Sequence, residues 1–217
     1  MKIGILCDLD GTLLDTLEDL TDAVNYALAQ FGCPAVTARQ VRSYLGNGAK
    51  QLIALSLPED RRQETDAVLA VYKPYYDVHC QIKTRPYDGI PEALAQLQEK
   101  YPVAIVSNKP DSAVKPLCAQ YFPGIYALGE DAGCPRKPAP DMLYKAMAAI
   151  DVDTCVYVGD SEVDVLTAKN AGAACLSVLW GFRDEPELAE NGAVYFCRRA
   201  ADMPAMIEKI LGEWHGQ

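Results

Sequence analysis

Short apolar runs alternate with helix-spaced apolar positions along the second half of this chain. Four runs have the length of buried strands: 103–106, 125–128, 154–158 and 174–179. Four segments have apolar residues at helical spacing: 90–100, 113–121, 141–150 and 163–171. This alternation is typical of a parallel sheet with helices on both faces. A first strand at 3–7, a last apolar run at 194–196 and a helix at 202–214 complete this pattern. The pattern predicts a doubly wound α/β core.

Residues 15–83 follow a different pattern, because every apolar segment there has helical spacing. Helices are expected at 17–31, 37–44, in a segment that ends at Leu57, and at 60–79. Gly32 and Pro34 end the first of them, and Gly46-Asn47-Gly48 separates the second from the third. We therefore expect a core of 1–14 and 84–217, interrupted by an all-helical insertion of about 15–83, which is typical of a lid beside an active site.

The first apolar run ends at Asp8-Leu9-Asp10-Gly11-Thr12. In open α/β sheets, ligands bind at the carboxyl ends of the strands. Two carboxylates one residue apart repel each other unless a cation lies between them, and Gly11 allows the backbone to approach a ligand closely. The pentapeptide therefore indicates a hard cation and an anionic substrate, as in phosphate chemistry.

Three more polar groups lie where they can share this crevice. They are Ser107-Asn108-Lys109, Arg136-Lys137-Pro138-Ala139-Pro140 and Gly159-Asp160-Ser161-Glu162-Val163-Asp164. Taken singly, Ser107, Asp160 and Asp164 are ordinary helix caps or first-turn residues, and Lys137 is an ordinary solvated lysine. A calcium loop would need further acidic residues that the first motif lacks. Capping does not explain four such clusters in a consistent order.

Composition and charge limit the partners. The chain has 217 residues, 50% hydrophobic and 23% charged, with a formal net charge of −10. Such a charge disfavours nucleic acid and anionic membranes and favours a small-molecule partner. The eight cysteines include no C-x-x-C pair, so reduced thiols are expected. No run approaches about 18 apolar residues and no signal peptide is visible, which predicts a cytoplasmic protein. Monomer and homodimer both stay open.

Together these motifs resemble the haloacid dehalogenase (HAD) superfamily of phosphohydrolases, in Asp8-Leu9-Asp10-Gly11-Thr12, Ser107, Lys137 and Gly159-Asp160-Ser161-x-x-Asp164. The resemblance implies a Rossmann-like core with a small helical cap inserted after the first motif. Leu45-Gly46-Asn47-Gly48-Ala49 and Pro86-Tyr87-Asp88-Gly89 are most similar to segments of phosphoglycolate phosphatases. Ser107 stands where these enzymes usually have Thr and keeps the hydroxyl.

The resemblance implies a role for each residue. Asp8 is the expected nucleophile, which forms an aspartyl-phosphate, and Asp10 the expected general acid and base. Mg2+ is expected to bind the Asp8 carboxylate, the Asp10 backbone carbonyl and Asp160, with Asp164 orienting them. The expected phosphate ligands are Thr12, Ser107, Asn108 and Lys137. Gly48 either presents backbone donors to a small carboxylate, as in phosphoglycolate, or belongs to a plain turn.

Other activities remain alternatives. Asp10 disfavours a dehalogenase, and Thr12 disfavours a sugar phosphomutase, which commonly has another residue there. A phosphonoacetaldehyde hydrolase would need a cap lysine, for which Lys50 is the nominal candidate. A pyrophosphatase or nucleotidase stays open because the cap sets specificity. A phospho-acceptor switch or phosphate-binding regulatory protein is the non-enzyme alternative, and release of more than one phosphate per chain would exclude it.

Overall fold

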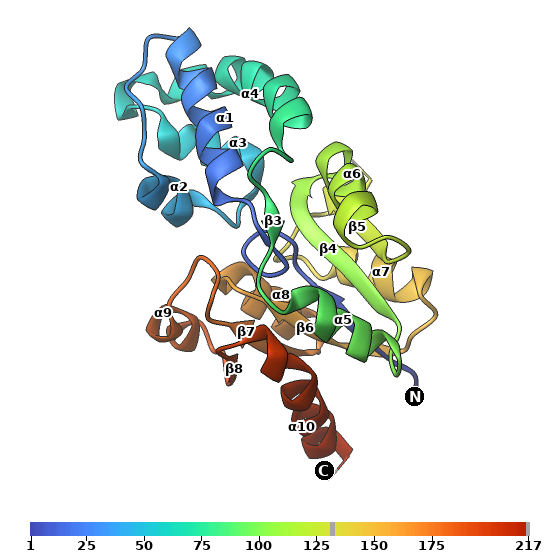
Figure 1. Ribbon diagram of the computed structural model, residues 1–217. Coiled ribbons are helices and arrows are strands. Elements are labelled where there is room, and N and C mark those ends of the chain that lie inside the picture. The colour runs from blue at the N-terminus through green and yellow to red at the C-terminus, as the bar shows by residue number, and fades with distance from the viewer. Residues whose placement is uncertain (131–132, 216–217) are drawn as a thin grey trace.

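Six parallel strands form the central sheet, in the order β5-β4-β1-β6-β7-β8 (Figure 1). The computed structural model describes residues 1–130 and 133–215. The strands are β1 (Ile3–Cys7), β4 (Val103–Pro110), β5 (Tyr126–Glu130), β6 (Thr154–Gly159), β7 (Ala174–Val178) and β8 (Tyr195–Cys197). At the centre, Cys7 of β1 is paired with Ile105 of β4 and with Val158 of β6. The prediction of a doubly wound parallel sheet is confirmed.

Helices pack on both faces of the sheet. They are α5 (Ile90–Gln98), α6 (Asp111–Tyr121), α7 (Asp141–Ala149), α8 (Glu162–Ala171), α9 (Glu185–Glu190) and α10 (Met203–His215). Because side chains alternate along a strand, Ile5 belongs to the apolar cluster that includes α5, α6 and α10, whereas Leu6 belongs to the cluster with α7 and α8. β1 is therefore buried on both sides, which explains its uninterrupted apolar sequence.

The insertion is built from helices, as expected. It contains α1 (Leu17–Gln30), α2 (Ala38–Tyr44), α3 (Gly48–Ser56), the 3-10 helix η1 (Glu59–Glu64) and α4 (Thr65–His79). Figure 1 shows α1 to α4, blue to teal, grouped together at the end of the molecule away from both termini. The chain leaves and re-enters the core through the antiparallel pair β2 (Leu14–Asp15) and β3 (Arg85–Pro86). The division at 14/15 and 83/84 remains a prediction.

Several elements differ from the sequence-based expectation, among them β4, η1 and α9. β4 continues through Ser107-Asn108-Lys109 to Pro110, with a register shift after Val106, because these polar side chains are buried among tertiary partners. Residues 59–64 form η1 where the helix was expected to begin at 60. The short helix α9 was not anticipated, since Leu188 is its single buried residue and gives no apolar period.

Two findings bear on the compositional expectations. Cys7 and Cys155 are buried free thiols inside the core, as predicted. Within the described part of the chain, no helix is long and apolar enough to cross a membrane.

Candidate active site

The loop after β1 turns sharply and places Asp8 and Asp10 at the edge of the sheet. The backbone N–H groups of Leu13 and Leu14 both donate to the Leu9 carbonyl, which closes the turn. Gly11 has a φ of +82°, and a Cβ atom there would lie 2.4 Å from Asp160 Oδ2. Only glycine fits this position, because a side chain would add backbone strain and displace Asp160.

Asp8 lies at the end of β1 and lines a cavity between the sheet and the inserted helices. Its Oδ1 accepts a 2.7 Å hydrogen bond from the Leu9 N–H and lies 3.0 Å from Lys137 Nζ. Burial raises the pKa of Asp8 to about 7, the Lys137 charge opposes that rise, and Asp164 and Asp10 add to it. A positive charge in the cavity would therefore strongly favour its ionised form.

Lys137 is almost completely buried and is surrounded by acceptors. Its Nζ lies 3.0 Å from Asp8 and donates at 2.8 Å to both Asp164 and the Tyr157 hydroxyl. Burial alone would lower the pKa of Lys137, but Asp164 and Asp8 outweigh burial and raise it above the ordinary lysine value. The ammonium is thus a permanent positive charge beside Asp8.

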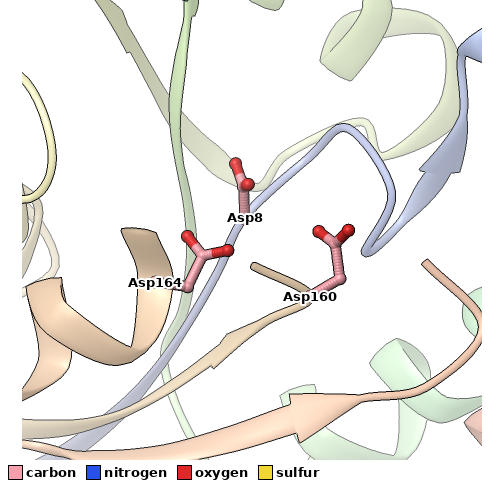
Figure 2. A group of neighbouring side chains, drawn as sticks. All are labelled: Asp8, Asp160 and Asp164. Carbon is pink, nitrogen blue, oxygen red and sulfur yellow. The ribbon is translucent and has the colours of Figure 1, made fainter. Parts of the chain in front are cut away.

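Asp8, Asp160 and Asp164 bring carboxylate oxygens within 4.8 Å of one another. Figure 2 shows these carboxylates gathered at one edge of the sheet, from β1, from the end of β6 and from α8. The pKa of Asp160 is raised well above its ordinary value, chiefly by burial and then by the charges of Asp164 and Asp8. Such a cluster of hard oxygen ligands could hold a divalent cation.

Asp164 is held through both of its oxygens, by Lys137 on one side and by the start of its own helix on the other. It accepts from Lys137 Nζ, from the Ser161 N–H and from the Ser161 hydroxyl, in a capping box at the start of α8. These contacts fit a role for Asp164 in orienting Lys137.

Thr12 lies behind Asp160. Its side chain is fully buried, and its hydroxyl donates a 2.9 Å hydrogen bond to Asp160 Oδ1. The Phe182 N–H donates to the other oxygen of the same carboxylate, at 2.7 Å. Thr12 therefore contacts Asp160, and its expected role as a phosphate ligand remains a prediction.

Ser107 and Asn108 both line the cavity, at the end of β4. Asn108 accepts from the Lys137 N–H and donates to the carbonyls of Lys137 and Gly46, at 2.9 to 3.0 Å. Its amide therefore joins the core, the Lys137 loop and the loop before α3. Gly48, the first residue of α3, also lines the cavity and has a φ of +77°.

The cavity is small and has two unlike sides. It measures about 50 Å3, a few times the ~10–15 Å3 that one water needs. Acidic and hydroxyl groups from the core line one side. Leucines and tyrosines from the insertion line the other: Leu20, Leu45, Leu52, Tyr72 and Tyr76. This space suits a small molecule.

Two charged residues at the site were not identified from the sequence. Lys109 was seen only as part of a polar motif, yet its Nζ donates to both oxygens of Asp10, at 2.9 and 3.0 Å. Arg183 is buried, pairs with Glu162 and donates to the carbonyls of Arg42 and Leu45 in the insertion. Nothing in the Arg183 sequence context indicated this role, since its partners are distant in the chain.

Comparisons with known proteins place this geometry in a family. The family model described as haloacid dehalogenase-like hydrolase matches residues 5–178, which include the second half of β1, all of β4 and β6, and all four motifs. The chain belongs to the haloacid dehalogenase-like hydrolase family. The resemblance inferred from the motifs is thereby confirmed, as is the fold that it implied.

Similar proteins indicate which class of reaction this chain catalyses. Phosphoglycolate phosphatase 1 of Pseudomonas aeruginosa is 37% identical over 200 residues, 86% of this chain and 73% of that protein. Phosphoglycolate phosphatase of Neisseria meningitidis is 36% identical, over 88% of this chain and 86% of that protein. A crystal structure of a candidate phosphoglycolate phosphatase from Lactobacillus delbrueckii subsp. bulgaricus has a TM-score of 0.88 and 38% identity, covering 94% of this chain and 97% of that one. Together, family and relatives make this HAD hydrolase a phosphatase.

Proposed function

We propose that this HAD phosphatase is a Mg2+-dependent phosphomonoester hydrolase that works through an aspartyl-phosphate on Asp8 and acts on 2-phosphoglycolate or a similarly small ester. The observation that carries the proposal is the placement of Asp8. Its carboxylate lines the cavity, lies 3.0 Å from the Lys137 ammonium and shares an acidic cluster with Asp160. The relatives named above support the substrate.

The donor set fits Mg2+. Asp8 and Asp160 are buried carboxylates that repel each other, and a hard divalent cation compensates that repulsion with the oxygen ligands it prefers. We assign the ion to the carboxylates of Asp8 and Asp160 and to the Asp10 backbone carbonyl. When bound, Mg2+ would neutralise charge on the transferring phosphoryl group.

Asp8 performs the first transfer. One of its carboxylate oxygens forms a bond to phosphorus while the bond between phosphorus and the ester oxygen breaks. The Lys137 ammonium, held by Asp164 and Tyr157, stays beside Asp8 and stabilises the negative charge that spreads over the phosphoryl oxygens. The Ser107 hydroxyl, which lines the same cavity, donates to one of these oxygens.

Asp10 moves the protons. It gives its proton to the departing alkoxide, which leaves as a neutral alcohol. Asp10 then takes a proton from the water that attacks phosphorus, and the acyl-phosphate bond breaks to release phosphate and free Asp8. Asp160 and its two donors, Thr12 and the Phe182 N–H, form a rigid side of the site throughout.

The insertion would act as the cap of this site. Residues 15–83 supply the apolar side of the cavity, and Arg183 ties the carbonyls of Arg42 and Leu45 to the core. A cavity this small, about 50 Å3, favours a two- or three-carbon phosphate ester over a nucleotide.

A phosphate-release screen tests the proposal. The purified protein would be assayed with and without Mg2+ against small phosphomonoesters, nucleotides, pyrophosphate and sugar phosphates, ranked by kcat/KM. We expect multiple turnovers that require Mg2+ and rank 2-phosphoglycolate first. A higher rank for pyrophosphate or a nucleotide would replace the substrate assignment, and release of at most one phosphate per chain would overturn the hydrolase.

A further inference from the structure

Lys109 is a buried cation that the proposed mechanism does not use. Its side chain is 2% exposed. The ammonium contacts both oxygens of Asp10 in the core and lies 2.5 Å from the Tyr76 hydroxyl of α4 in the cap. It also lies 4.6 Å from the centre of the Tyr76 ring. One lysine thus joins the residue that faces the leaving group to the cap.

The ammonium of Lys109 differs in charge from the groups around it in the cavity. The cap side of the cavity is apolar, and the core side carries the carboxylates of Asp8, Asp10 and Asp160. Among the described residues that line the cavity, Lys109 alone carries a positive charge. A buried ammonium is stable only with anionic or polar partners, so its position favours an anionic group on the small molecule that enters.

The position of Lys109 along the substrate follows from its contact with Asp10. If Asp10 protonates the leaving oxygen, the next atoms of the leaving group lie close to Asp10 and therefore close to Lys109 Nζ. In 2-phosphoglycolate, the carbon that bears the leaving oxygen also bears the carboxylate. A carboxylate at that point comes within reach of the ammonium, which donates up to three hydrogen bonds.

We propose that Lys109, assisted by the Tyr76 hydroxyl, binds the carboxylate of the leaving group. It thereby selects phosphate esters of short hydroxy acids over phosphate esters of uncharged alcohols of equal length. The inference rests on the proposed function and deepens it. When the carboxylate enters, it replaces Asp10 as the partner of the ammonium, and Asp10 becomes available to the leaving oxygen. The buried charge stays paired at each stage.

Tyr76 contributes a second donor. Lys109 donates to the Tyr76 oxygen, and the described part of the chain holds no acceptor for the hydroxyl proton, which an incoming carboxylate can therefore accept. Burial and then Asp10 raise the pKa of Tyr76 well above its ordinary value, so this proton is retained at neutral pH.

Arg136 is the other cation near the cavity that could bind the substrate carboxylate. Its guanidinium lies near Gly48, 3.0 Å from where a Cβ would stand, but Arg136 is exposed and lines a separate groove with Lys50 and Lys73. Selection by Arg136 would require the carboxylate to point away from Asp10, toward that groove. The two arrangements are separable by substitution.

The test compares 2-phosphoglycolate with ethyl phosphate, which has the same length and no carboxylate. Both esters release an alkoxide and need the same proton from Asp10, so the ratio of their kcat/KM values isolates the carboxylate. Lys109→Met is expected to lower this ratio about 10- to 100-fold, chiefly through KM for 2-phosphoglycolate, and Tyr76→Phe to lower it less. Lys109→Arg, which keeps the charge, is expected to restore most of the ratio.

Lys100→Met is the matched control, because Lys100 forms an exposed pair with Glu208 and lines neither the cavity nor the Arg136 groove. Its ratio should equal that of the unaltered protein. Equal losses for both esters in Lys109→Met would overturn the proposal and make Lys109 a support for Asp10 only. A collapse of the ratio in Arg136→Met but not in Lys109→Met would overturn it in favour of Arg136.

A binding measurement covers the case in which turnover is lost. Calorimetry of 2-phosphoglycolate and ethyl phosphate would be done on Asp8→Asn with and without Lys109→Met, after thermal melting has shown that both proteins fold. We expect Lys109→Met to weaken only the binding of 2-phosphoglycolate, and equal weakening would contradict the inference. Failure of the proposed function is a separate result, because the unaltered protein would then release no phosphate from any ester.

Discussion

At the scale of single residues, two aspartates one residue apart have different surroundings. Asp8 is held against the buried Lys137 and beside Asp160, whereas Asp10 contacts Lys109 on the cap side. The first environment suits a nucleophile that must stay ionised, and the second suits a group that faces the leaving atom. Burial alone does not separate their roles, but their partners do.

Asp8→Asn tests the nucleophile. The amide has nearly the same shape but cannot attack phosphorus, so phosphate release from 2-phosphoglycolate should fall by about 10,000-fold or more. Because the substitution removes a buried charge whose pKa is raised to about 7, the melting temperature should not fall below that of the unaltered protein. Retained turnover in a clean preparation would exclude the covalent mechanism.

Asp10→Asn tests the acid. For alkyl phosphates such as 2-phosphoglycolate, kcat/KM should fall about 100- to 1,000-fold, because the alkoxide then leaves without a proton. p-Nitrophenyl phosphate needs little protonation of its leaving group and should lose less than about 10-fold. Equal losses for the two substrates, measured in steady state, would contradict the assignment.

At the scale of elements, one buried carboxylate in the first turn of α1 helps to hold the crossing between cap and core. Asp19 accepts hydrogen bonds from the backbone N–H groups of Lys83 and Thr84, where the chain returns from the cap to β3. These bonds satisfy the buried N–H of Thr84 and the partly buried N–H of Lys83. They also fix where the two crossings of the chain meet.

Asp19→Ala should therefore destabilise the protein by about 2–4 kcal/mol, since it leaves these backbone donors unsatisfied. Asp22→Asn is the control three residues later, where an exposed carboxylate pairs with Lys83, and should change stability by less than about 0.5 kcal/mol. Urea unfolding curves measure both. Similar effects for the two variants would show that Asp19 does not help to hold the crossing.

At the scale of the whole molecule, the acidic cluster is expected to make stability depend on pH and on the cation proposed to bind there. Burial raises the pKa values of Asp8 and Asp160 above the 3.8 of an unperturbed aspartate, so the folded state binds more protons than the unfolded state above about pH 4. The free energy of unfolding of the metal-free protein should therefore fall as pH rises from about 4 toward 7. A bound divalent cation offsets this loss.

Thermal melts with Mg2+ or with chelator check this expectation. At about pH 7.5, Mg2+ at 100 times its Kd should raise the melting temperature by about 5–10 °C, and at about pH 5 by less. Asp160→Asn should raise the melting temperature of the metal-free protein and remove most of the Mg2+ effect. Asp66→Asn, at an exposed position, should do neither. An equal Mg2+ effect in both variants would contradict the assigned site.

The sequence by itself determined the alternation of strands and helices, the helical insertion and the chemistry at the strand ends. Asp8, Ser107 and Asp160 could be grouped from their positions in the chain, because parallel strands end at one edge of a sheet. Lys137 was grouped with them as part of a polar segment that precedes a helix, and the family motifs gave it a role. The local pattern did not predict α9, whose residues show little apolar periodicity. It also did not predict the end of β4, where polar residues continue the strand.

Only the tertiary structure decided which polar groups face one another. Lys109 reaches Asp10 across 99 positions and Tyr76 across 33, and Thr12 donates to Asp160 across 148. These contacts depend on how the cap packs against the sheet and on the turn that Gly11 permits. A local pattern records which residues a segment can bury or expose, whereas the partner of a buried charge is set by segments that folding brings together.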